Sequence, residues 1–241
     1  GKPKGAMLSQ ENLVSNSKVL SDLWEISNKD QLIHSLPIYH THGLFVAINT
    51  SMIAGASIRF IKGFNLDLII EAIPNSTLLM GVPTFYTRLL KDKRLTKSLT
   101  SNMRLFISGS APLLEETHNQ FENMTGHKIL ERYGMTETNM NASNPLKGER
   151  KAGSVGKALK GTSIRITSIG ENNLLEINEP GMIEIKGPNV FTGYLNKPEK
   201  TKEAFTDDEY FITGDMGYFD KEGYLFISGR NKDLIISGGY N

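Results

Sequence analysis

Apolar positions in the first 148 residues follow two alternating periods. Short apolar runs typical of buried strands lie at 57–61, 76–82, 104–108 and 128–134. Between them, apolar side chains recur every three or four residues, which predicts helices at 65–73, 83–95 and 113–126. Pro83 suits a first helical turn, and Gly126 suits a helix end. This strand–helix–strand alternation predicts an α/β sheet whose strands are largely parallel.

The pattern changes after Gly148. Strands become short and are punctuated by glycine, in the runs SIRITS (163–168), MIEIKG (182–187), YFITGD (210–215) and GYLFIS (223–228). GYFD and GYLFIS flank Lys221–Glu222 as the arms of a hairpin would. We therefore expect a small antiparallel, barrel-like subdomain after the α/β unit. The expected division is 1–148 for the α/β portion of a larger domain, 149–230 for the β-rich subdomain, and 231–241 for a hinge.

Composition and charge exclude several classes of protein. The 241 residues are 39% hydrophobic with a net charge of +1, which suits a globular chain and indicates no nucleic-acid or anionic-membrane partner. No cysteine is present, which excludes disulfides, thiolate nucleophiles and cysteine-based zinc sites. The longest charge-free apolar stretch, between His42 and Arg59, is shorter than the roughly 20 residues of a membrane-spanning helix. We expect a cytoplasmic protein, or a mitochondrial one if a targeting segment has been lost.

Chemistry-bearing residues gather where predicted strands end, which is where open α/β sheets bind ligands. GSAPL (109–113) follows one strand, YGMTET (133–138) ends another, and ITGD (212–215) places the Asp215 carboxylate at a predicted turn. The basic segment GRNKDLI (229–235) comes near the end of the chain. Taken singly, each has an ordinary explanation as a turn, a helix cap or a solvated charged pair. Their occurrence together, in this order, points to a ligand site.

The opening stretch GKPKGAMLSQENL (1–13) joins glycines and lysines to a helix-like segment, which is typical of a loop that holds phosphate. A Walker-type loop requires G-x-x-x-x-G-K followed by Ser or Thr. Lys4 is instead followed by Gly5 and Ala6, so no hydroxyl stands next to the lysine for magnesium. The Walker interpretation is therefore excluded.

These motifs together resemble the adenylate-forming superfamily of acyl-CoA synthetases, luciferases and peptide-synthetase adenylation domains. GKPKG is similar to the second half of its phosphate loop, LPIYHTHGLF to its substrate-gate segment, and GSAPL and YGMTE to its adenine and metal segments. ITGD is similar to its ribose-binding motif and GRNKDLI to its hinge. The strings GVPTFYTRLL, RLFISGSAPL and LERYGMTETNMNASNP resemble the malonyl-CoA synthetases within it. Complete members are longer, so the resemblance implies a chain truncated at both ends, without the C-terminal domain that carries a catalytic lysine.

The resemblance implies an AMP-forming acid–thiol ligase. Malonate would attack the α-phosphorus of ATP, with Mg²⁺ as cofactor, and coenzyme A as co-substrate would then displace AMP to give malonyl-CoA. One alternative is an acyl-CoA synthetase for another short or medium carboxylic acid. The other is that the isolated chain is a nucleotide-binding module that turns nothing over.

The resemblance also implies roles residue by residue. Lys4, Thr136 and Glu137 would be catalytic at the phosphates, with Glu137 as the magnesium ligand. Tyr133 is expected to stack on adenine, and Asp215 to accept both ribose hydroxyls. The implied nucleotide-binding residues are Gly109, Ser110, Ala111, Pro112, Tyr133, Gly134, Met135, Thr136, Asp215 and Arg230. Lys232 matches the hinge position.

A malonate pocket needs a fixed cation, because burying the second carboxylate without a partner is costly. Arg88, in the helix opened by Pro83, is the preferred candidate, and Arg132 is the alternative. An ordinary surface pair with Asp92, four residues further on, would instead explain Arg88.

Three further residues complete the expected acyl site. His40 resembles the gate histidine that contacts the acyl group or guards the pantetheine tunnel. His42 competes for that role, and either histidine could simply be hydrogen-bonded in a loop. Ser108, at the end of a predicted strand, is expected to line the acyl pocket.

Overall fold

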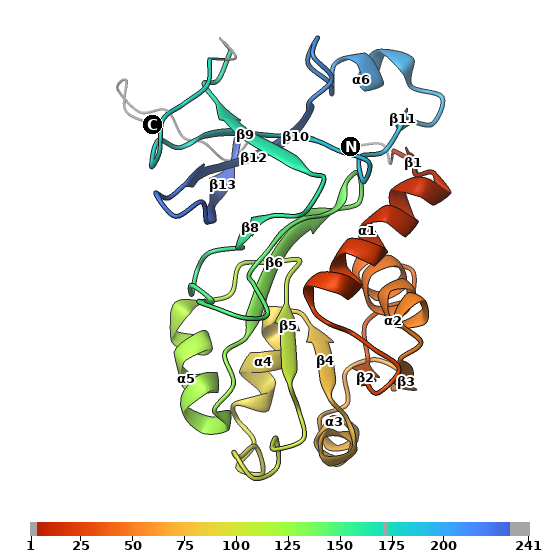
Figure 1. Ribbon diagram of the computed structural model, residues 1–241, viewed down its shortest axis with the longest axis vertical. Helices are drawn as coiled ribbons and strands as arrows, with labels where there is room; N and C mark the ends of the chain where they lie inside the picture. Colours follow the sequence, from red (N-terminus) through yellow and green to blue (C-terminus); the bar gives the residue numbers. More distant parts are fainter. Residues whose placement is uncertain (1–3, 171–172, 232–241) are drawn as a thin grey trace.

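The computed structural model describes residues 4–170 and 173–231, and it contains three sheets (Figure 1). The largest has seven strands in the order β3-β2-β4-β5-β6-β7-β8. A four-stranded antiparallel sheet has the order β13-β12-β10-β9, and a two-stranded ribbon joins β1 to β11. The predicted fold class, a largely parallel α/β unit followed by antiparallel strands, is confirmed.

Five parallel strands form most of the large sheet: β2 (Gln31–His34), β3 (Ser57–Phe60), β4 (Leu78–Gly81), β5 (Leu105–Ser108) and β6 (Leu130–Met135). Two antiparallel strands complete it, β7 (Asn139–Ser143) and β8 (Lys157–Ala158). The strand runs predicted from the sequence are confirmed, whereas β2, β7 and β8 were not anticipated. The large sheet therefore continues past residue 148 as far as Ala158.

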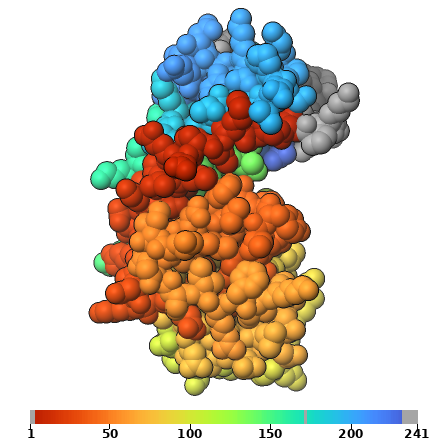
Figure 2. Space-filling model, turned by 90° about the vertical axis from the view of Figure 1, so that its right-hand side faces the viewer, coloured from red at the N-terminus to blue at the C-terminus, as the bar shows by residue number. Residues whose placement is uncertain are grey.

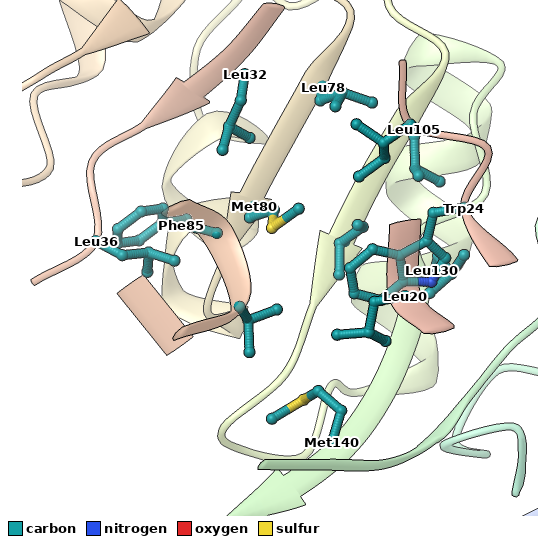
Figure 3. Packing of buried hydrophobic residues seen from close by; sticks show 14 of the residues in the cluster. Leu20, Trp24, Leu32, Leu36, Leu78, Met80, Phe85, Leu105, Leu130 and Met140 are labelled. Atoms are coloured by element: carbon teal, nitrogen blue, oxygen red, sulfur yellow. The ribbon is translucent and has the colours of Figure 1, made fainter. Parts of the chain in front are cut away.

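Helices cover both faces of this sheet. One face carries α1 (Gln10–Leu23), the π-helix η1 (His42–Ile48) and α2 (Asn49–Ala54); the other carries α3 (Leu66–Ala72), the 3₁₀ turn η2 (Ile73–Asn75), α4 (Pro83–Leu89) and α5 (Glu115–Thr125). Leu78 and Met80 pack with Leu20 and Trp24 on the first face (Figure 3), while Leu79, between them, joins the cluster on the second. Burial on both faces explains why these strands are continuous apolar runs.

Local sequence sets the helix ends. Ser9 caps α1, because its side chain accepts from the N–H of Asn12, whose own side chain accepts from the N–H of Ser9. The predicted end at Gly126 is confirmed, with a φ of 79°. The helix predicted over 83–95 is too long, since α4 ends at Leu89. Asp92 then accepts from the N–H of Arg94, a turn contact that competes with helical continuation.

The second unit consists of β9 (Ser163–Thr167), β10 (Gly181–Lys186), β12 (Phe211–Phe219) and β13 (Leu225–Arg230), with α6 (Pro198–Lys202) beside it. The predicted hairpin is confirmed by the pairing of Tyr218 with Phe226. The turn predicted at Asp215 is wrong, because this residue lies within β12 and pairs with Arg230. The strand is irregular here: Gly214 has a φ of 75°, and the pairing register shifts after Met216. Because such an irregularity and a turn both favour glycine, the sequence around Asp215 resembles that of a turn.

Buried residues of both units meet in one cluster. Tyr133 and Ala142 of the large sheet pack there with Ile183, Ile185 and Leu225 of the second sheet. In Figure 2 the N-terminal segment, coloured red, lies between the two parts, and β1 (Ala6–Met7) pairs with β11 (Gly193–Tyr194). No helix in the described ranges is long and apolar enough to cross a membrane.

Strand order identifies a switch point in the large sheet. The connection from β2 to β3 runs through η1 and α2 on one face, whereas the connection from β3 to β4 runs through α3 on the other. Since β2 lies between β3 and β4, the chain leaves the carboxyl ends of β2 and β4 in opposite directions. Ligands of open α/β sheets bind in the crevice at such a point.

Candidate active site

Several polar side-chain atoms near this switch point are buried without a hydrogen-bond partner among the described residues. They belong to His34, Ser35, His42, Ser108 and Arg132. Unpaired buried polar groups are rare because each loses its hydration without compensation. Their grouping at the ends of β2, β5 and β6 is therefore expected of a ligand pocket. Ser108, predicted to line the acyl pocket, is fully buried there.

Arg132 is the buried cation of this group. Its side chain is on β6, its residue is 3% exposed, and its Nε and Nη2 have no partner in the described structure. Burial lowers its pKa to about 9. A Cβ on Gly109 would lie 2.5 Å from Cζ of Arg132, so a side chain at this position would require the guanidinium to move. The first residue of the GSAPL segment, Gly109, therefore lies next to the guanidinium of Arg132.

The two competing histidines have different environments. His40 is exposed, and its Nδ1 lies 3.5 Å from the N–H of His42. His42 is buried, and its Nδ1 lies 3.3 Å from Oγ of Ser110, a residue with a φ of 70°. Burial and the nearby charge of Arg132 hold the pKa of His42 well below its usual value. His42 is therefore a neutral imidazole near Arg132, whereas the side chain of His40 is exposed to solvent.

Arg88 is exposed on α4, with its guanidinium carbon 5.1 Å from the ring centroid of Phe64. The surface pair with Asp92 that would explain it does not form. Asp92 instead accepts three side-chain hydrogen bonds from Arg94, at 3.0, 3.2 and 2.6 Å. The guanidinium of Arg88 thus has no carboxylate partner among the described residues.

Thr136 and Glu137 occupy the tight connection between β6 and β7. A Cβ on Gly134 would lie 2.0 Å from the backbone oxygen of Asn139, so the hairpin closes only with glycine at that position. Thr136 is exposed, and its hydroxyl lies 3.5 Å from that of Thr41. The backbone oxygen of Glu137 accepts from the N–H of Phe191 at 2.8 Å.

Tyr194 connects two of the predicted residues and was missed by sequence analysis. Its hydroxyl donates to Oε1 of Glu137 at 2.9 Å, and Nζ of Lys4 lies 4.1 Å from its ring centroid. Burial and the adjacent Glu137 carboxylate raise the pKa of Tyr194, so the phenol keeps its proton. Its only sequence signal is the pair Gly193–Tyr194, which is indistinguishable from an ordinary turn.

A cavity of about 590 Å³ opens beside these residues. Its walls include Lys4, Met135, Glu137, Tyr194, Lys200, Thr213, Gly214 and Arg230. Four predicted site residues from three distant parts of the chain thus share one cavity. The exposed loop Ser110, Ala111 and Pro112 does not line it, nor do Arg88 and His40. Lys232 lies outside the described residues.

Asp215 lies at the junction of the two units. Its Oδ2 accepts from the hydroxyl of Tyr133 at 2.6 Å, and its Oδ1 lies 3.2 Å from Nε of Arg230. Burial and the Asp215 charge raise the pKa of Tyr133, so this phenol also stays protonated. The backbone of β12 and β13 therefore presents a carboxylate and a guanidinium side by side.

The residues fit a magnesium ion brought by a nucleotide. No group of three or more His, Cys, Asp or Glu able to hold a metal occurs in the described part of the chain. Glu137 supplies one hard carboxylate at the cavity wall. Mg²⁺ in nucleotide sites is typically held by one or two carboxylates together with phosphate oxygens and water, which is what this donor set allows.

Comparison with known proteins defines the class: residues 1–195 match the family of AMP-binding enzymes, and the chain belongs to that family. It is 41% identical over 261 residues to the malonate–CoA ligase of Arabidopsis thaliana, covering all of this chain and 42% of that protein. The long-chain-fatty-acid–CoA ligase of Bacillus subtilis is 36% identical, with 44% of its length covered.

Among solved structures, MatB from Rhodopseudomonas palustris with ATP bound superimposes with a TM-score of 0.99 at 58% identity. The match covers all of this chain and 48% of MatB. The chain thus spans about half the length of the curated relatives it matches.

Proposed function

We propose that the protein carrying this chain is an AMP-forming malonate–CoA ligase and that the chain is its substrate- and nucleotide-binding core. Support comes from family membership, from the malonate–CoA ligase of Arabidopsis thaliana among its relatives, and from its likeness to MatB. For the structural division, we propose that residues 1–148 and 149–230 form its α/β and β-rich parts, and that Lys232 belongs to a hinge.

One observation carries the choice of malonate: the buried, unpartnered guanidinium of Arg132. An uncompensated buried charge costs several kcal/mol, roughly, so such a group is retained where a ligand neutralises it. Malonate has a second carboxylate that a guanidinium can bind through two parallel hydrogen bonds. Ser108 and the neutral His42 would add hydroxyl and imidazole contacts. Arg88 is the second candidate for this carboxylate.

In the first half-reaction, an oxygen of the reacting carboxylate attacks the α-phosphorus of ATP, and the bond to pyrophosphate breaks. Lys4 would neutralise phosphate charge, and Thr136 would donate its hydroxyl to a phosphate oxygen. Glu137 would hold Mg²⁺, which supplies charge neutralisation at the phosphates when bound. In the second half-reaction, the thiol sulfur of coenzyme A attacks the acyl carbon, and AMP leaves.

The nucleoside end of ATP would lie against the β-rich part. Asp215 would accept both ribose hydroxyls, with Arg230 reaching the ribose or a phosphate. Tyr133, Gly134 and Met135 would form one wall of the adenine site, with Gly109, Ser110, Ala111 and Pro112 forming the other.

The test is malonate-dependent exchange of labelled pyrophosphate into ATP by the full-length protein. We expect exchange with malonate well above that with acetate or a fatty acid. Strong exchange with a monocarboxylate and none with malonate would assign it instead to another acid, as the relation to the Bacillus subtilis ligase allows. Nucleotide binding by the isolated chain without turnover would identify it as a binding module only. We propose a cytoplasmic location, with mitochondria as the alternative; cell fractionation tests this.

A further inference from the structure

The segment around β11 contacts two parts of the proposed phosphate site, Glu137 and the stretch that follows Lys4. Phe191 donates its N–H to the backbone oxygen of Glu137 at 2.8 Å, and three residues later the hydroxyl of Tyr194 donates to the Glu137 carboxylate at 2.9 Å. Glu137 is thus held twice, by backbone and by side chain, from one short stretch. A carboxylate with one oxygen fixed this way keeps its orientation and leaves its other oxygen for a cation.

The same segment holds the stretch that follows the proposed phosphate loop. Ala6 and Met7 pair with Tyr194 and Gly193, and the N–H of Leu195 donates to the backbone oxygen of Gly5 at 2.8 Å. Lys4, one residue earlier, places its ammonium 4.1 Å from the Tyr194 ring centroid. A cation over an aromatic face is stabilised by the ring quadrupole. One side chain therefore contacts the lysine through its ring and the glutamate through its hydroxyl.

Tyr194 is itself held rigidly. It is 6% exposed, its ring packs edge-on to that of Phe191 at 4.8 Å, and its N–H donates to Oγ1 of Thr201 at 2.9 Å. A Cβ on Gly193 would lie 2.6 Å from a side-chain carbon of Thr201, so the strand fits closely on α6. A side chain fixed on all these sides can orient another with little loss of conformational freedom.

We propose that Tyr194 is a positioning residue: its hydroxyl sets the Glu137 carboxylate for Mg²⁺, and its ring keeps Lys4 beside that metal position. This inference rests on the proposed nucleotide site, but it does not depend on malonate being the acid. Hydrogen bonds to a metal-binding carboxylate commonly change metal affinity by about 10- to 100-fold. The expected signature is therefore a defect in the metal-dependent part of ATP binding alone.

The experiment measures binding of a non-hydrolysable ATP analogue to the full-length protein by calorimetry, with Mg²⁺ and without it. Tyr194→Phe removes only the hydroxyl and keeps the ring. We expect the gain in affinity caused by Mg²⁺ to fall by about tenfold, with metal-free binding unchanged. In a Glu137→Gln background, Tyr194→Phe should have no further effect, because the two act through one contact.

Tyr224→Phe is the matched control. Tyr224 is also buried, donates its hydroxyl to the backbone oxygen of Glu149 at 2.8 Å, and has lysines 4.6 and 4.7 Å from its ring centroid. It does not line the cavity, so its removal should leave the Mg²⁺-dependent gain intact.

A second variant tests the same proposal in case the Tyr194→Phe protein does not fold. Thr201→Val keeps Tyr194 but removes the side-chain acceptor of its N–H, together with a bond from the Thr201 hydroxyl to the backbone oxygen of Lys197, so we expect a smaller loss of the Mg²⁺-dependent gain, about threefold. An unchanged gain in both variants, or an equal loss with and without Mg²⁺, would overturn the proposal. Because no acid is present, failure here differs from a failure of malonate-dependent exchange.

Discussion

The hydroxyl of Tyr133 donates to Oδ2 of Asp215 at 2.6 Å, and this bond joins the two units of the chain. Tyr133 comes from β6 of the large sheet, and Asp215 comes from β12 of the antiparallel sheet. Both are at least nine-tenths buried. A carboxylate fixed in this way by a charged hydrogen bond presents its remaining lone pairs in one direction, as recognition of a sugar diol requires.

We predict that Tyr133→Phe weakens AMP binding. The variant keeps the ring but removes a hydrogen bond to a charged group, worth about 1.5–3 kcal/mol, so affinity should fall by roughly tenfold or more. Calorimetry with AMP measures this. The control is Tyr218→Phe. Tyr218 lies in β12, as Asp215 does, and its ring stacks on Phe226, so this variant should bind AMP normally. Equal affinity in both variants would rule out a role for the Tyr133 hydroxyl.

The parallel core was predictable because apolar periodicity reports burial directly. Leu78, Leu79 and Met80 are fully buried on alternating faces, and the sequence shows them as one apolar run. The strand β7 was not predictable in this way. Its residues Asn139–Ser143 are buried but mostly polar, and polar groups from elsewhere in the chain bond to this segment: the Asn16 amide donates to the backbone oxygen of Met140, and the Asn189 amide donates to Oδ1 of Asn141.

The residues of the proposed site also differ in whether the sequence alone could identify them. Motif resemblance identified Lys4, Glu137, Asp215 and Arg230, and the structure brings these distant segments to the junction of the two units. Tyr194 could not be identified from the sequence, because its importance lies in contacts with Glu137 and Lys4. These residues lie 57 and 190 positions earlier in the chain. A pattern of neighbours in sequence carries no information about such contacts.

We predict that Arg132→Met abolishes malonate use and stabilises the fold. Methionine fills the volume without a buried charge, and even buried ion pairs can often be replaced by apolar groups of similar volume with a gain of up to about 1–4 kcal/mol. Malonate-dependent pyrophosphate exchange should fall at least about 100-fold, since a buried carboxylate would lose its partner. ATP binding should be unchanged.

Arg88→Met is the matched variant. Arg88 is exposed, so its loss should not raise stability. If Arg88 alone holds the second carboxylate, then malonate exchange will fail in this variant and survive in Arg132→Met. That result would contradict the assignment to Arg132.

We predict that Gly134→Ala destabilises the hairpin that carries Thr136 and Glu137. The added methyl would meet the Asn139 backbone oxygen, which cannot rotate away, so β6 and β7 must separate. The free energy of unfolding should fall by more than about 2 kcal/mol, as measured by urea denaturation. Gly153→Ala is the comparison, because nothing lies within 4 Å of its added methyl and only its φ of 77° opposes substitution. A smaller loss for Gly134→Ala than for Gly153→Ala would contradict the steric argument.

The last prediction concerns acid stability at the opposite end of the sheet. Asp30, 4% exposed, accepts from Nε and Nη2 of Arg104 at 2.8 and 2.7 Å and from the hydroxyl of Thr77 at 2.7 Å. Burial would raise the pKa of Asp30, but hydrogen bonds from Arg104, Thr77 and the N–H of Ser27 outweigh it, so the pKa lies below its usual value. Asp30→Asn should therefore lower the free energy of unfolding at neutral pH by about 3 kcal/mol.

The pH dependence has a definite sign. Because folding lowers the pKa of Asp30, its contribution is fully present above the unfolded-state pKa of about 3.9 and is lost as the pH falls through the lower folded-state value. The stability difference between wild type and Asp30→Asn should be constant from about pH 5 to 7 and shrink below about pH 4. Urea unfolding at a series of pH values measures it. A difference that persisted undiminished in acid would mean that Asp30 stabilises the fold by packing, not by its charge.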